Sequence, residues 1–198
     1  MPEATFPIFV SVSHALHVAY LMAVQPGLQR SPTQVLIESL QQQHGKVEQR
    51  VASMVNRGDL RPIEFRAQCA LVVAAARGHL MPPEHAAVRA RFGHQRTKAE
   101  GVAALAEYVQ PSAGIEHALA LRALVWRQYH VGGQRDRDRW SLRAIEKETG
   151  VTVHVLRRAA DVVRSMGEAL EVRADARLAL LFEQRGLIPP AAEVAQAA

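Results

Sequence analysis

The chain has 198 residues, of which 48% are hydrophobic and 5% aromatic, and its formal net charge is +5. This hydrophobic content supports a folded core and excludes a wholly disordered chain. The single cysteine, Cys69, excludes an intramolecular disulfide and a cysteine-based zinc site, and it fits a reducing, cytoplasmic setting.

The abundance of alanine and leucine favours helices over sheets, so the composition predicts an all-α fold. Ser13 is the expected N-cap of the first helix, which ends before Pro26. Residues 8–24 contain serines and histidines among their apolar residues. This mixture indicates a buried helix, and not a signal peptide or a membrane span.

A second helix is predicted at residues 31–45, with Ser31 as its cap and Gln34 as the capping-box partner. Residues 46–60 have no clean period and stay unassigned. A third helix is predicted to begin at Pro62. Its expected inward stripe is Phe65, Cys69, Val72 and Val73.

Two shorter signals predict the next helices. Pro82 begins the fourth helix, which ends at Gly93. Thr97 and Glu100 have the spacing of a capping box for the fifth, and Pro111 is expected to end it. The buried positions expected in the fifth helix are Val102, Leu105, Ala106 and Val109. The basic residues around this connection favour a polar link between two helices over a contact with the DNA backbone or a protein partner: Arg89, Arg91, Arg96 and Lys98.

A sixth helix is predicted from Ile115 to about His130. Apolar residues surround most of its circumference, which indicates a central position. These residues are Leu119, Leu121, Leu124, Val125 and Trp126. An exposed loop follows, and a last helical segment extends to about Glu183.

The stretch SLRAIEKETGVTVHVLRR, residues 141–158, places a turn between two helical patterns. Ser141 is the expected cap of the first helix, and Gly150 suits the positive φ that ends it. Thr152 is the expected cap of the second helix. The apolar residues of the second helix are expected to pack back onto Leu142 and Ile145: Leu156, Ala159, Ala160 and Val163.

This stretch resembles the helix-turn-helix superfamily of DNA-binding proteins, many members of which read L..IA..LGVS..TV.R. The matching positions are Leu142, Ile145, Gly150, Val151, Thr152, Leu156 and Arg158. The resemblance implies sequence-specific binding to double-stranded DNA through the second helix, which lies in the major groove. The residues that it places against DNA are Thr152, Val153, His154, Arg157 and Arg158.

The sequence departs from the family pattern at two positions. Glu146 replaces the small residue usual where the two helices nearly touch, and Thr149 replaces an apolar residue. Both changes are expected to weaken the packing between the helices.

Four further arginines are candidate phosphate contacts: Arg135, Arg137, Arg139 and Arg143. The alternating segment QRDRDRW, residues 134–140, fits either a loop beside the groove or a solvated loop whose charges pair with one another. Trp140, at its end, is expected to anchor the loop to the core.

We therefore predict a multi-helix N-terminal domain at residues 1–111 for partner binding or oligomerisation. A helix-turn-helix DNA-binding domain follows at residues 112–190, and then a loosely ordered tail at 191–198. The expected function is that of a DNA-binding transcriptional regulator. Chain length and motif placement are similar to those of phage or prophage regulators, including Q-type antiterminators. Double-stranded DNA is the main expected partner, with RNA polymerase and a second copy of the chain as candidates and no membrane.

Two alternatives stay open. One is a helical protein-interaction module, or an RNA polymerase-associated antitermination factor that reads no operator of its own. Its candidate dimer seam is Leu170, Leu178, Leu181 and Phe182. The other is a small ligand-gated regulator, which is less favoured because aromatic and polar residues do not converge in the N-terminal helices. No motif for catalysis, a cofactor or a metal is found, so no enzyme activity is expected.

Overall fold

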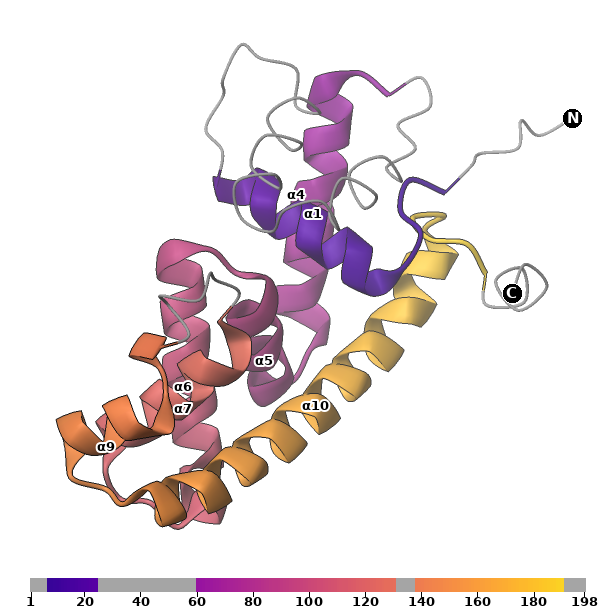
Figure 1. Ribbon diagram of the computed structural model, residues 1–198. Helices are drawn as coiled ribbons and strands as arrows, with labels where there is room; N and C mark the ends of the chain where they lie inside the picture. Colours follow the sequence, from indigo (N-terminus) through magenta and orange to yellow (C-terminus); the bar gives the residue numbers. More distant parts are fainter. Residues whose placement is uncertain (1–6, 25–59, 131–137, 191–198) are drawn as a thin grey trace, which may run out of the picture. The chain divides into compact units, whose positions relative to one another are not determined.

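The computed structural model describes residues 7–24, 60–130 and 138–190. Within these ranges the chain forms seven α-helices and no strand (Figure 1). The all-α prediction is therefore confirmed for this part of the chain. Outside it lie the predicted helix at 31–45, all but the last residue of segment 46–60, and the tail at 191–198.

The chain folds into two compact units. Unit 1 comprises Met1–Leu80 and Asp175–Ala198, and unit 2 comprises Met81–Ala174. The predicted division after residue 111 falls inside unit 2, within helix α6 (Gln95–Ala113). The units differ from the predicted domains because α6 packs against the helices on both sides of it in the sequence.

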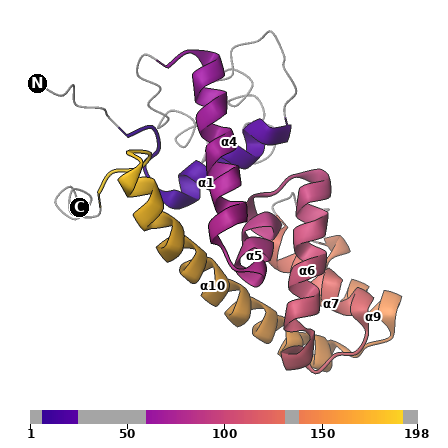
Figure 2. The ribbon, with the colours of Figure 1, turned by 180° about the vertical axis from the view of Figure 1, so that it is seen from behind.

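In unit 1, helix α1 (Val12–Val24) crosses helix α4 (Pro62–His79), as both views show (Figure 1, Figure 2). The fully buried rings of Phe9 and Phe65 meet beside them, with ring centroids 6.2 Å apart. The predicted stripe of α4 is largely confirmed, since three of its members are buried and the fourth is half-buried. The buried residues are Phe65, Cys69 and Val72, and the half-buried residue is Val73.

The predicted cap of α1 is wrong by two residues. The hydroxyl of Ser11 accepts a hydrogen bond of 3.1 Å from the His14 backbone N–H, so Ser11 is the capping residue. Ser13 lies inside the first turn. Both serines precede the apolar run, and the choice between them depends on backbone geometry that the sequence pattern does not contain.

The candidate dimer seam is also wrong. Leu170, Leu178 and Phe182 have no exposed surface within the single chain, and Leu181 is half-buried. A seam between two chains needs side chains that are exposed in each separate chain. These residues instead belong to the protomer's own core.

Helix α5 (Pro82–Phe92) opens unit 2 and has the predicted bounds. The Glu84 carboxylate accepts a 3.0 Å hydrogen bond from the Met81 N–H, and Gly93 follows the last helical residue. The predicted start and end of this helix are therefore confirmed.

Helix α6 differs from the prediction at both ends. Its N-cap is His94, and Thr97 lies within the helix. The Glu100 carboxylate pairs with Arg89 and Arg96, and no capping box forms with Thr97. At the other end α6 continues past the predicted stop at Pro111 to Ala113, and Gly114 ends it in the left-handed region at φ 63°. Proline fits in this last turn because its ring fixes a helical φ.

Helix α7 (Ala118–Tyr129) is central to unit 2, as predicted, except for one side chain. Leu121, Leu124 and Val125 are buried, but Leu119 is 61% exposed. Leu119 lies in the first turn, where the helix has not yet entered the packed interior. The core of unit 2 combines apolar residues from four further segments with those of α7. Its buried members from these segments include Ala87, Leu105, Val109, Ile145, Leu156, Val163 and Leu170.

Candidate nucleic-acid interface

Two helices meet at a tight turn in unit 2. Helix α9 (Leu142–Thr149) is capped by Ser141, whose hydroxyl accepts a 3.2 Å hydrogen bond from the Ala144 N–H. Gly150 follows with φ 73° and ψ −1°, and its N–H donates to the Glu146 carbonyl oxygen at 2.7 Å. Helix α10 (Val153–Gln184) begins three residues later. The predicted glycine turn is therefore present.

The inward faces of the two helices pack as the spacing predicts. Ile145 of α9 is 2% exposed, and Leu156 of α10 has no exposed surface. Ala159 and Val163 continue the buried stripe along α10. The residues that pack partly against this core are Leu142, Val151 and Ala160.

Glu146 and Thr149, the two departures from the family pattern, hold the turn together. The Glu146 carboxylate accepts a 2.9 Å hydrogen bond from the backbone N–H of Val153. The Thr149 hydroxyl donates to the Ile145 carbonyl oxygen at 2.7 Å and accepts from the Val151 N–H at 3.4 Å. Both polar side chains thus satisfy backbone groups where the chain reverses.

Thr152 occupies the predicted N-cap position, but its hydroxyl is not the group that caps α10. Its carbonyl oxygen accepts the first helical hydrogen bond, from the Leu156 N–H at 3.0 Å. The side-chain acceptor at this helix end belongs to Glu146. Within the described residues the Thr152 hydroxyl makes no hydrogen bond, and the side chain is exposed.

The predicted reading residues are Thr152, which directly precedes α10, and four residues in the first two turns of the helix. His154, Arg157 and Arg158 are exposed, as is Thr152, whereas Val153 is half-buried. Neither Arg157 nor Arg158 forms an ion pair with another described residue.

The loop arginines divide into two groups. Arg135 and Arg137 lie outside the described residues. Arg139 is exposed and its guanidinium lies 5.3 Å from the centre of the Trp140 ring, while Arg143 is exposed on α9. Trp140 packs partly against the core, as expected of an anchor, and its ring stacks on Trp126 with centroids 6.1 Å apart.

The basic residues around the connection between α5 and α6 make contacts within the protein, as expected. Arg89 and Arg96 pair with Glu100, and Arg91 pairs with Glu171 of α10. The half-buried Lys98 donates to the Arg91 carbonyl oxygen at 3.5 Å. Burial lowers the pKa of Lys98 to about 8.

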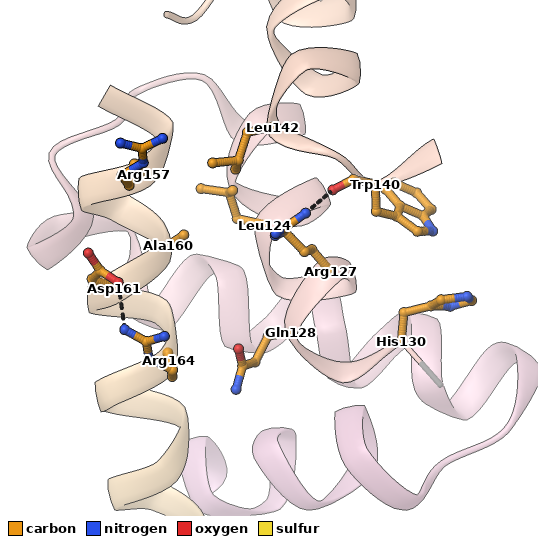
Figure 3. A pocket seen from close by; sticks show the side chains of 10 residues that line it. All are labelled: Leu124, Arg127, Gln128, His130, Trp140, Leu142, Arg157, Ala160, Asp161 and Arg164. Carbon is orange, nitrogen blue, oxygen red and sulfur yellow. Dashed lines mark hydrogen bonds and ion pairs between the residues drawn. The ribbon is translucent and has the colours of Figure 1, made fainter. Parts of the chain in front are cut away.

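A cavity of about 590 Å³, which the sequence does not predict, is lined in part by Arg157 (Figure 3). It is lined by Leu124, Arg127, Gln128, His130, Trp140, Leu142, Arg157, Ala160, Asp161 and Arg164. The sequence does contain a signal for its α10 wall. Arg157, Asp161 and Arg164 follow at i, i+4 and i+7, which places them on one helix face.

Two of the cavity's arginines have partners on its wall. The Arg127 guanidinium donates to the Trp140 carbonyl oxygen at 3.0 Å, and that of Arg164 pairs with Asp161 at 2.6 Å. Figure 3 shows Arg157 on the same wall as Asp161 and Arg164, without a partner among the residues drawn.

Other classes of site are limited by two findings. Among the described residues, no group of three or more histidine, cysteine, aspartate or glutamate side chains could hold a metal ion. No helix in the same part of the chain is long and apolar enough to span a membrane. The sequence matches no protein-family model and no curated protein.

Proposed function

We propose that this chain binds double-stranded DNA and regulates transcription. In this proposal α9, the Gly150 turn and the first turns of α10 are a helix-turn-helix. The start of α10 enters the major groove, which is wide enough for one helix.

The proposal rests on one observation, which is that Arg157 and Arg158 are exposed and unpaired among the described residues. Both are exposed directly after the turn, and neither has an ion-pair partner among the described residues. Elsewhere in unit 2, Arg89, Arg91 and Arg164 are paired with carboxylates. A guanidinium that is free of carboxylates keeps all five of its N–H donors for another acceptor.

Arginine matches the O6 and N7 acceptors of guanine in the major groove with two parallel hydrogen bonds. Arg157 and Arg158 have this role in the proposal. Thr152 and His154 flank them with a hydroxyl and an imidazole, both of which bond to base edges or phosphate oxygens.

Phosphate contacts in the proposal come from α9. Arg143 and Lys147 are exposed on it, and neither pairs with a carboxylate among the described residues. Such contacts set the orientation of the protein on the duplex and give binding its dependence on salt. The regulatory role follows from the resemblance of residues 142–158 to helix-turn-helix regulators, and RNA polymerase is a further partner in this proposal.

The test is a paired substitution measured on a duplex selected from a random pool by the wild-type protein. R157A/R158A should weaken binding by about 30-fold or more, since each bidentate contact is worth roughly 1–3 kcal/mol. Fluorescence anisotropy with labelled duplex measures the affinity. Circular dichroism checks that the fold is retained, which is expected because both side chains are exposed.

R77A/R185A is the matched control. Both arginines are exposed in unit 1, so this variant removes the same charge from outside the proposed interface. Its affinity should change by less than about threefold, because neither arginine belongs to the proposed interface. Equal losses in the two double variants would overturn the assignment of α10 as the reading helix.

A further inference from the structure

The cavity beside Arg157 has the chemistry of a ligand site. Its volume of about 590 Å³ lies within the usual range of small-molecule pockets, roughly 300–1,000 Å³. Leu124 is buried, and Leu142 and Ala160 are half-buried, so part of the wall is apolar. Trp140 also lines the cavity.

The charged part of the wall is mainly positive. The three arginines and the one aspartate of the wall together carry a net charge of +2. The positive groups also come from different elements: Arg127 from α7, and Arg157 and Arg164 from α10 (Figure 3). An anion in the cavity is therefore approached by guanidinium groups from two sides, which is the arrangement that binds carboxylates and phosphates.

The three arginines of the cavity differ in their hydrogen-bond and ion-pair partners, and these partners determine which guanidinium can bind a ligand. The Arg127 guanidinium donates one hydrogen bond to the Trp140 carbonyl oxygen, which fixes its position. Its other N–H groups have no partner among the described residues. Arg164 is neutralised by Asp161. Arg157 has no ion pair within the described residues and is the open cation of the wall.

We propose that this cavity binds a small organic anion with a flat apolar body, and that the bound anion engages Arg157. Arg164 lies seven residues along α10 from Arg157, a rise of about 10 Å. In this proposal the ligand contacts Leu142 and Trp140, and Arg157 belongs both to the cavity wall and to the proposed reading surface. The anionic group of the ligand binds the Arg157 guanidinium, which is then not available to contact a base. The second half of this inference rests on the proposed function, whereas binding of the anion does not.

Tryptophan fluorescence gives a direct readout. The chain has two tryptophans, Trp140 lines the cavity, and Trp126 stacks on Trp140 with an interplanar angle of 13°. The probe is phenyl phosphate, which joins a flat apolar ring to an anion. Benzyl alcohol supplies the ring without the charge, and inorganic phosphate supplies the charge without the ring.

Phenyl phosphate should change the fluorescence along a saturable curve, at a concentration about tenfold below that needed for inorganic phosphate. Benzyl alcohol should give no saturable change. If the two phosphates act at equal concentration, or if neither gives a saturable curve, the proposed ligand class is wrong.

Two substitutions on neighbouring turns should act in opposite directions. Arg164→Gln removes a cation and leaves Asp161 facing the ligand, so affinity for phenyl phosphate should fall by about tenfold. Asp161→Asn releases Arg164, so affinity should rise by about threefold or more. Both side chains are exposed, and both variants should fold. Arg77→Gln, on α4, is the control and should leave the curve unchanged. Equal curves for all four proteins would show adventitious binding and overturn the site.

The link to DNA is tested separately on the selected duplex. Saturating phenyl phosphate should weaken DNA binding by about fivefold or more at constant ionic strength, and Arg164→Gln should need about tenfold more phenyl phosphate for the same effect. Saturable fluorescence with unchanged DNA affinity would overturn the link through Arg157 and leave the anion site standing. A protein that binds phenyl phosphate but no duplex would overturn the proposed function and not this pocket.

Discussion

The carboxylate of Glu146 in α9 accepts a 2.9 Å hydrogen bond from the backbone N–H of Val153, the first residue of α10. The bond connects the two helices across the turn and places a negative charge at a helix N-terminus, where the helix dipole favours it. The same charge lies beside the residues proposed to contact DNA, and in that proposal it repels the phosphate backbone. In the proposal, the Glu146 charge therefore increases the stability of the protein and decreases its affinity for DNA.

Glu146→Gln should separate the two effects. Glutamine keeps an oxygen acceptor for the Val153 N–H but carries no charge, so affinity for the selected duplex should rise by about threefold to tenfold. The stability should fall by less than about 1 kcal/mol. Anisotropy titration and urea unfolding measure the two quantities. A decrease in DNA affinity with intact folding would contradict the proposed position of the phosphate backbone.

Glu146→Ala removes the acceptor as well. It should cost about 0.5–2 kcal/mol of stability, as the loss of a helix cap does. Urea unfolding of the alanine and glutamine variants together isolates the hydrogen bond. Equal stability of the two would mean that the bond to Val153 contributes nothing measurable.

The left-handed backbone at Gly150 predicts a specific order of substitutions. A Cβ at Gly150 meets no atom within 4 Å, so Gly150→Ala is disfavoured by the φ of 73° alone. The expected loss is about 1–2 kcal/mol, and Gly150→Asn should lose less because asparagine tolerates this region.

Gly78 is the control for Gly150. It lies inside α4, has no positive φ, and also offers open space to a Cβ. Gly78→Ala should therefore stabilise the protein by up to about 1 kcal/mol. Thermal unfolding of the variants checks both signs, and stabilisation by Gly150→Ala would rule out the left-handed turn.

The close approach of α5 and α6 predicts a larger effect at Gly101. A Cβ there would lie 2.6 Å from the Ala90 backbone nitrogen, which is too close without movement of the helices. Gly101→Ala should destabilise the protein by about 1–3 kcal/mol. A urea unfolding midpoint equal to that of the wild type would show that these helices do not pack at this distance.

Lys98 predicts a dependence of stability on pH. Its folded pKa is lowered by burial to about 8, against 10.5 for the unfolded side chain. Between these values the unfolded chain holds a proton that the folded chain has released, so Lys98 makes the free energy of unfolding rise with pH. Below about pH 8 the lysine is charged in both states and burial of the charge is a constant cost.

Lys98→Met should therefore stabilise the protein at pH 7 and reduce the rise between about pH 8 and pH 10.5. Urea unfolding of both proteins at matched pH values measures the difference. An unchanged pH profile in the methionine variant would place the titration on another group.

The sequence predicted those elements whose signals are local. Proline at the start of α4 and α5, the apolar stripe of α6 and the glycine turn before α10 each depend on a few adjacent residues. The errors arose where two local signals compete, as at Ser11 and Ser13, or where a residue has a tertiary partner. Glu100 resembled a capping residue, but it pairs with Arg89, eleven positions away.

The candidate site followed the same division. The exposure of His154, Arg157 and Arg158 follows from helical spacing, and the structure places all three on the surface. The cavity could not be predicted in full because its walls join α7, the Trp140 segment and α10. The role of Glu146 was missed for the same reason, since its acceptor atom reaches a backbone N–H seven residues later.

The central claim is that the start of α10 reads base edges in the major groove. Selection of binding sites from a random pool of duplexes, followed by guanine N7 methylation interference on the recovered sites, tests it most directly. The account predicts a shared sequence element in which methylation of guanine N7 blocks binding by the wild-type protein. Recovery of no shared element, or binding that is indifferent to methylation at every guanine N7, would contradict it.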